Sequence, residues 1–140
     1  SGKKINVVFE DNADWEQGIA EDYFDLFLQT GKQFDAVVCN NDTMAMGALE
    51  AVIAANSECV IVGTDGTSEA LESIKAGELD ATVDFFPTTM GAIGVEMQIR
   101  KLGGQEVPKV IYAPQCVRDI DNAEMSFEEI FGYEYAPVFE

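Results

Sequence analysis

The sequence predicts an α/β fold built on a parallel sheet, and three observations lead to that prediction. Segments rich in β-branched and aromatic residues alternate with segments whose apolar residues recur at helical spacing. The spacing of these alternating segments is that of βαβ units, in which a right-handed crossover joins two parallel strands. The segment 58–65, "ECVIVGTD", is continuously apolar, as expected of a strand covered on both faces. Helices on both faces would give a three-layer α/β/α sheet.

Local signals set the bounds of the expected elements. The expected strands are 4–10, 34–40, 58–65, 79–85 and 109–114. The expected helices are 13–32, 42–56, 68–78 and 88–104. Gly31 and Gly77 end two of the helices, and Pro87 opens another at a position where proline is tolerated. For the helix that begins at residue 42, the cap is Asn41 or Asp42.

Composition restricts the partners. The chain has 140 residues, of which 47% are hydrophobic, and this suffices for one domain with a core of its own. Eight basic residues against 26 acidic ones give a net charge of −18. Such a charge disfavours nucleic acid, anionic membranes and phosphorylated ligands, and it leaves neutral or cationic partners.

The side chains that most often perform catalysis are scarce. There is no histidine, which removes the commonest general base and metal ligand. The three cysteines are widely spaced and form no CxxC pair, and Cys39 and Cys59 lie in apolar runs typical of a core. We therefore expect no enzyme activity, no metal and no cofactor. No apolar run has the roughly 20 residues that span a bilayer, and the start, "SGKK", lacks the apolar region of a signal peptide.

The strand ends carry polar and aromatic side chains without any lysine or arginine. Ligands of open parallel sheets bind beyond the carboxyl ends of the strands. The residues expected there are Glu10, Asp11, Asn12, Asp14 and Trp15, then Asn40, Asn41 and Asp42, then Thr64 to Thr67, and finally Asp84, Phe85 and Phe86. Carboxylates and amides bind hydroxyl groups, and an indole covers the apolar face of a sugar ring. The set predicts a polyol site better than a phosphate site.

Purely structural roles compete with ligand binding at these positions. Asn41, Asp42 and Thr67 are all helix-capping residue types, and for Asp42 capping is the favoured interpretation. Trp15 fits a hydrophobic staple as well as a lid over a ligand. Asp65 differs, because in "GTDGT" its carboxylate stands between glycines at the end of a buried strand.

Three motifs resemble a known family. "NNDTMAMGALEAV", "VIVGTDGTSEALESIKAGELDATV" and "NADWEQ" are similar in type and order to segments of the type I periplasmic sugar-binding proteins, and the resemblance runs from about residue 4 to about residue 122. It implies one Rossmann/flavodoxin-like lobe of such a protein. It also implies ligand-binding roles for Asn41 and Asp65, which would bind hydroxyls, and for Trp15, which would stack on the ring. Phe85 occupies the position where family members usually carry Gln or Asn, which puts the usual sugar in doubt.

The resemblance implies that the chain corresponds to part of a two-lobed receptor. Residues 1–122 would form a partial C-terminal lobe, and the helix 88–103 would cross to the other lobe. Residues 123–140 would form an acidic and aromatic tail with one helical turn. The lobe's first strand, which would lie between strands 4–10 and 34–40, has no match. The implied setting is extracytoplasmic, with a neutral monosaccharide as ligand and the membrane permease of an ABC transporter, or a chemotaxis system, as partner. The unpaired strand edge and the apolar side of the helix 88–103 predict a homodimer.

Three other interpretations fit part of the sequence. A phosphoacceptor receiver domain would use Asp65 and the acidic pair Glu10 and Asp11, but it gives "NNDTMAMG" no role. The effector domain of a lactose-repressor-type regulator shares the expected fold, but the chain has no helix-turn-helix and no basic patch. An assembly-only fragment, which binds no ligand by itself, would explain the absent strand and lobe.

Overall fold

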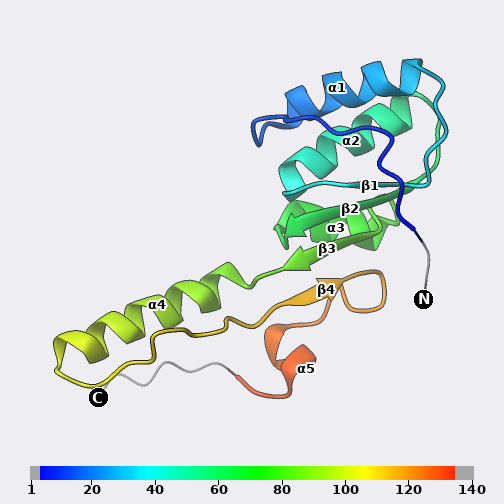
Figure 1. Cartoon of the computed structure of the whole chain (residues 1–140). Coiled ribbons are helices and arrows are strands. Elements are labelled where there is room, and N and C mark those ends of the chain that lie inside the picture. Colours follow the sequence, from blue (N-terminus) through cyan, green and yellow to red (C-terminus); the bar gives the residue numbers. More distant parts are fainter. Residues whose placement is uncertain (1–3, 135–140) are drawn as a thin grey trace.

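A four-stranded sheet with helices packed on it forms the body of the protein (Figure 1). The computed structural model describes residues 4–134. The helices are α1 (Gln17–Gln29), α2 (Asp42–Ala54), α3 (Ser68–Ala76), α4 (Pro87–Leu102) and α5 (Phe127–Phe131). The strands are β1 (Ala36–Val38), β2 (Val60–Asp65), β3 (Ala81–Asp84) and β4 (Cys116–Arg118).

The sheet has the order β1-β2-β3-β4 and is mainly parallel. β1 pairs with β2 and β2 with β3 in parallel, each pair joined through one helix, as the alternating pattern predicts. β4 runs antiparallel to β3, with Val83 opposite Val117. The predicted α/β class is therefore confirmed, with one antiparallel strand added at the edge.

Two predicted strands are wrong. Residues 4–10 have the composition of a strand but no regular secondary structure, and Ile5 is largely exposed. Residues 109–114 likewise form no strand and run alongside α4 (Figure 1). In both segments the residue types favour a strand, but among the described residues no neighbouring strand pairs with them. A strand is stabilised by ladder hydrogen bonds to a neighbour, which composition cannot supply.

The core lies on one face of the sheet. Ile61 of β2 and Ile74 of α3 are almost fully buried, and they pack in one cluster with Leu49 of α2 and with Phe24 and Phe27 of α1. Gly63 lets α2 approach β2, because a Cβ there would overlap Asp42 Oδ1. Cys39 and Cys59, which were predicted to be core residues, are half-buried and pack against the outside of this cluster.

The other face of the sheet is open within the described part of the chain. Val38 is 75% exposed, and Val60 and Val117 are about half exposed. The continuous apolar pattern of 58–65 predicted cover on both faces, and the described residues supply cover on one. A continuous apolar pattern shows that a strand can be covered twice, but it does not show that this chain contains both covers.

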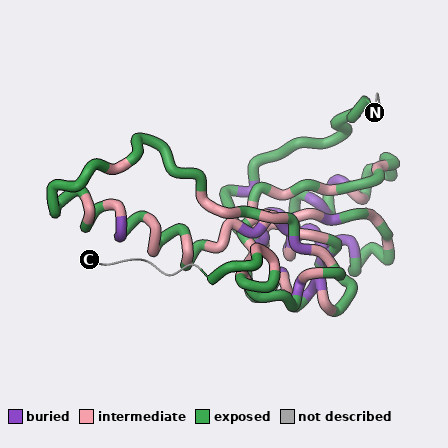
Figure 2. Tube along the Cα trace, turned by 90° about the horizontal axis from the view of Figure 1, so that it is seen from below, coloured by how far each residue is buried: buried purple, intermediate pink, exposed green. Residues whose placement is uncertain are grey.

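α4 forms an arm that points away from the sheet. It leaves the end of β3 and returns through residues 105–115 to β4, and the two segments lie side by side (Figure 1). Most of the arm is exposed or half-buried, whereas buried residues gather in the sheet and its helices (Figure 2). Leu102, near the tip of the arm, is 88% exposed.

Candidate functional site

The carboxyl ends of the parallel strands meet at the edge where the loop before α1, the start of α2 and the start of α4 also lie (Figure 1). Pairing places Asp65 at the end of β2 opposite Asp84 at the end of β3. The hydroxyl of Thr64 donates a 3.3 Å hydrogen bond to the Cys39 carbonyl and so ties the end of β2 to that of β1. All four predicted ligand residues, Trp15, Asn41, Asp65 and Phe85, thus belong to this edge.

Trp15 and Asn41 are in direct contact, although 26 positions separate them. The Asn41 side-chain amide donates to the Trp15 carbonyl at 3.4 Å. The loop before Trp15 is a tight turn, in which the Asn12 and Asp14 side chains hydrogen-bond to each other at 2.9 Å. Trp15 is 62% exposed, so a hydrophobic staple that buries the side chain does not describe it. An exposed tryptophan whose backbone is tied to an asparagine side chain is suited to a ring-shaped polyol.

Asn41, rather than Asp42, caps α2. The Asn41 Oδ1 accepts a 2.8 Å hydrogen bond from the Met44 amide, and the backbone of Asn41 is extended as an N-cap requires. Asp42 is the first residue of the helix, and its carboxylate points inward. The prediction of a capping Asp42 is therefore wrong, and Asn41 has a structural role of its own beside any role in binding.

Asp42 is instead buried and accepts hydrogen bonds from two other elements. Its Oδ1 accepts from the Thr82 hydroxyl at 2.6 Å, and its Oδ2 accepts from the Thr67 amide at 2.7 Å. The carboxylate therefore joins α2, the turn before α3 and β3 beneath the candidate site. The sequence offered no signal for this link, because Thr67 and Thr82 lie 25 and 40 positions away.

Asp65 presents an exposed carboxylate in an unusual backbone conformation. Its φ of 123° is followed by 74° at Gly66, and a Cβ at Gly66 would overlap the Asp84 carboxyl. The glycine is required there for both reasons. Partial burial, and next the nearby Asp42 carboxylate, raise the pKa of Asp65. A cation or a hydroxyl donor at this carboxylate would offset that unfavourable environment.

Phe85 follows β3 directly and is half-buried. Its neighbour Asp84 is buried and forms an ion pair with Arg118 of β4 at 2.8 Å, so this arginine is already neutralised. The sequence pattern indicates Asp84 as a strand-end residue but does not indicate its partner. Arg118 lies 34 positions beyond Asp84, in a segment for which no strand was predicted.

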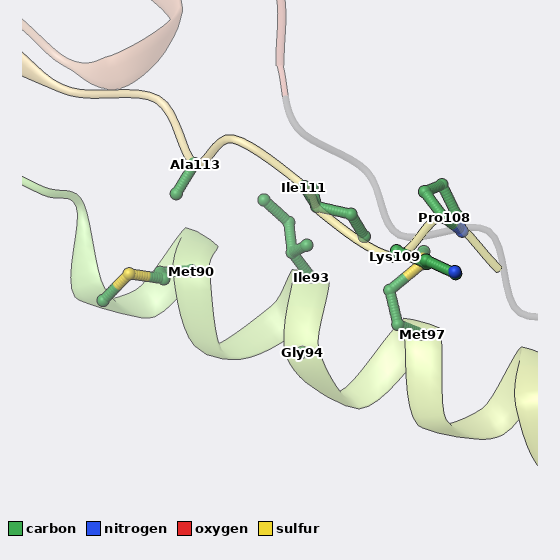
Figure 3. A pocket seen from close by; sticks show the side chains of 8 residues that line it. All are labelled: Met90, Ile93, Gly94, Met97, Pro108, Lys109, Ile111 and Ala113. Carbon is green, nitrogen blue, oxygen red and sulfur yellow. The ribbon is translucent and has the colours of Figure 1, made fainter.

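An apolar groove lies in the arm rather than among these residues. It is formed between α4 and the returning segment and has a volume of about 340 Å³ (Figure 3). Met90, Ile93 and Met97 of α4 face Ile111 and Pro108 across it. It contains no carboxylate or amide side chain among its lining residues, so the polyol chemistry predicted for the strand ends does not apply to it.

Within residues 4–134 the structure shows no cluster of three or more potential metal ligands. No helix in that range is both long and apolar enough to cross a membrane. Burial, and next the nearby Asp42, raise the pKa of the Cys39 thiol to about 11, which keeps it protonated and weakens it as a nucleophile.

The geometry defines an α/β lobe with a polar and aromatic edge suited to a small polyol, and comparisons with known proteins give the family. A profile described as "Periplasmic binding protein domain" matches residues 1–106. The chain is 36% identical over 115 residues to a putative rhizopine-binding protein of Rhizobium meliloti, and 36% identical over 112 residues to the ribose import binding protein RbsB of Bacillus subtilis. Each alignment covers 80% of this chain.

Comparison with solved structures gives the same family. A periplasmic solute-binding protein of an ABC transporter from Actinobacillus succinogenes, solved with bound D-allose, superposes with a TM-score of 0.81 at 29% identity. The match covers 84% of this chain and 43% of that one. The chain belongs to the type I periplasmic sugar-binding protein family. It spans 37% of the length of each of the two curated relatives, so it matches only part of them.

Proposed function

We propose that this chain contributes one side of a binding site for a neutral sugar or related polyol and performs no catalysis. Trp15 stacks on the ring, Asn41 and Asp65 bind hydroxyl groups, and Phe85 packs against the ligand in place of the amide usual in the family. The observation that carries the proposal is the contact between Asn41 and the Trp15 backbone at the edge where Asp65 ends β2.

The charge of the edge supports a neutral ligand over a phosphorylated one. Asp65 is exposed, while the arginine nearest to it in the sheet, Arg118, is buried against Asp84. A phosphate group would meet carboxylates without a free guanidinium. The relatives' names support the same class, because they bind ribose or, in the solved structure, D-allose.

The wider setting is proposed from the relatives. They are named as import or periplasmic binding proteins, which supports an extracytoplasmic receptor that delivers its ligand to the permease of an ABC transporter. We also propose residues 1–122 as a partial C-terminal lobe, and a homodimer that covers the exposed α4 arm. Such a receptor encloses its ligand between two surfaces, and this chain offers one. We therefore expect affinity near the millimolar range, about −4 kcal/mol.

Trp15 provides a direct test, because it is the only tryptophan in the chain. Titration with ribose, D-allose and ribose 5-phosphate, followed by tryptophan fluorescence and calorimetry, should show weak saturable binding of the two neutral sugars. Asp65→Ala should abolish it. Asp22→Ala removes the same charge from an exposed position on α1 and should leave it unchanged. Tight binding of the phosphosugar, or equal loss in both variants, would contradict the proposal.

A further inference from the structure

An aromatic cluster sits at the point where the arm leaves the sheet. Phe86, the residue before α4, packs edge-on against Phe127 and Phe131 of α5, with ring centroids 5.1 and 5.5 Å apart. Phe127 also contacts Tyr133 at 5.5 Å. We call Phe127, Phe131 and Tyr133 the α5 cluster. The family profile matches residues 1–106, so these three residues lie outside that match.

Arg118 ties the same cluster to the sheet. Its guanidinium lies 5.8 Å from the centroid of the Phe86 ring and forms the buried ion pair with Asp84. It also donates hydrogen bonds to the carbonyls of Asn122, Ala123 and Met125 at 3.1, 3.0 and 2.7 Å. The turn that leads into α5 is therefore held to β4 by one buried side chain. Arginine suits this place, since its planar fork donates to several acceptors at once.

The backbone at Phe86 is held in a conformation that phenylalanine rarely adopts. Its φ is 48° and its ψ is 65°, in the left-handed region, where a side chain with a Cβ is disfavoured. The Phe86 amide donates to Asp84 Oδ1 at 2.7 Å, while Asp84 Oδ2 accepts from Arg118. Backbone in this region persists only where the surroundings hold it in place. Here the surroundings are the Asp84–Arg118 pair on one side and the α5 cluster on the other.

We infer that Arg118 and the α5 cluster are positioning residues for the bend between β3 and α4, through their contacts with Phe86. By holding Phe86 left-handed, they set the direction in which the arm leaves the sheet. They also set where Phe85, the preceding residue, stands at the candidate ligand site. Only the statement about Phe85 rests on the proposed function. The statement about the bend rests on contacts within the chain.

A simpler role for α5 would be to cover apolar surface without affecting the bend. The two roles differ in what happens to the bend when α5 is weakened. If α5 is only a cover, weakening it exposes aromatic rings and speeds amide exchange in α5 alone. If the cluster holds the bend, weakening α5 also exposes the Phe86 amide and the first turn of α4 to exchange. In that turn the Met90 amide donates to the Phe86 carbonyl at 3.0 Å.

Amide hydrogen exchange of the whole chain, without ligand, separates the two roles. In Phe131→Ala, exchange at residues 85–90 should rise by about tenfold or more over the wild type, while β2 stays protected. Tyr112→Ala removes an aromatic ring that is 91% exposed on the arm, and it should leave 85–90 unchanged. Phe127→Leu keeps apolar volume in α5 and provides a second test if Phe131→Ala folds poorly. Faster exchange in α5 with unchanged exchange at 85–90, in either variant, would overturn the inference.

The contribution of Phe85 is tested separately. If the wild type binds sugar, Phe131→Ala should weaken that binding by about tenfold, in line with misplacement of a site residue by a distant change. Unchanged affinity beside faster exchange at 85–90 would overturn the statement about Phe85 and keep the statement about the bend. If the wild type binds no sugar, the proposed function fails, and the exchange result still decides whether α5 holds the bend.

Discussion

The Asp42 carboxylate accepts a 2.6 Å hydrogen bond from the Thr82 hydroxyl across β2, and both side chains are almost fully buried. The contact passes over β2 at Gly63, which pairs with Thr82 and where a Cβ would overlap Asp42 Oδ1. A polar contact that joins α2 to β3 therefore lies directly below the loops that carry Asn41 and Asp65. Asp42 thus links elements around the candidate site although its own carboxylate is buried.

Asp42→Ala should destabilise the fold far more than Asn41→Ala. Removing the Asp42 carboxylate leaves the buried Thr82 hydroxyl and the Thr67 amide without their acceptor, at a cost of roughly 2–4 kcal/mol. Removing the Asn41 cap costs about 1 kcal/mol. Urea unfolding of both variants measures the difference. Equal losses would show that the buried Asp42 carboxylate contributes no more than an ordinary cap.

Gly63→Ala and Gly91→Ala should change stability in opposite directions. At Gly63 the added Cβ meets the Asp42 carboxylate, which two hydrogen bonds hold in place, and we expect a loss of about 2 kcal/mol. Gly91 lies exposed inside α4 with open space around it, and alanine there should gain about 0.5–1 kcal/mol. Thermal unfolding of the two variants makes a matched pair. A tolerated Gly63→Ala would mean that α2 shifts away from β2 at little cost.

The sequence predicted the positions of the candidate residues better than the contacts around them. Asn41 and Asp65 each lie at or just beyond the end of a strand, as predicted, because that position follows from local pattern. The partners of Asp42 and Asp84 depend on which strands become neighbours, and local pattern does not contain that information. Arg118 in particular belongs to a strand of three residues that runs antiparallel, too short to show a period of its own.

The failed strands have the same cause. Residues 4–10 and 109–114 carry the residue types of strands, and the types are all that a single sequence shows. Within the described chain, Phe9 instead stacks on Phe27 of α1 at 4.8 Å, and Ile111 lines the groove beside α4. Phe9 and Ile111 thus contact helices rather than strands, whereas Ile5, Val110 and Tyr112 remain largely exposed.

Asp65→Asn should stabilise the fold at neutral pH. Burial and the nearby Asp42 raise the pKa of Asp65, so the folded chain binds that proton more tightly than the unfolded chain does. As pH rises from the unfolded pKa through the higher folded one, ionised Asp65 therefore lowers the free energy of unfolding. The amide variant lacks this loss, and its advantage should appear across that window and then level off. Urea unfolding at acid and neutral pH is the measurement, and a difference independent of pH would refute the expectation.

Self-association should strengthen with salt and should depend on the arm. Exposed apolar surface at Leu102 favours a partner, while a net charge of −18 on each copy opposes one. Because salt near 0.15 M screens charges beyond about 8 Å, raising it should increase the dimer fraction in sedimentation. Leu102→Glu should weaken the dimer at every salt concentration. Leu26→Glu adds the same charge to an exposed position on α1 and should weaken it less. A compact monomer throughout would rule out the dimer, and equal weakening by the two variants would place its contact away from the arm.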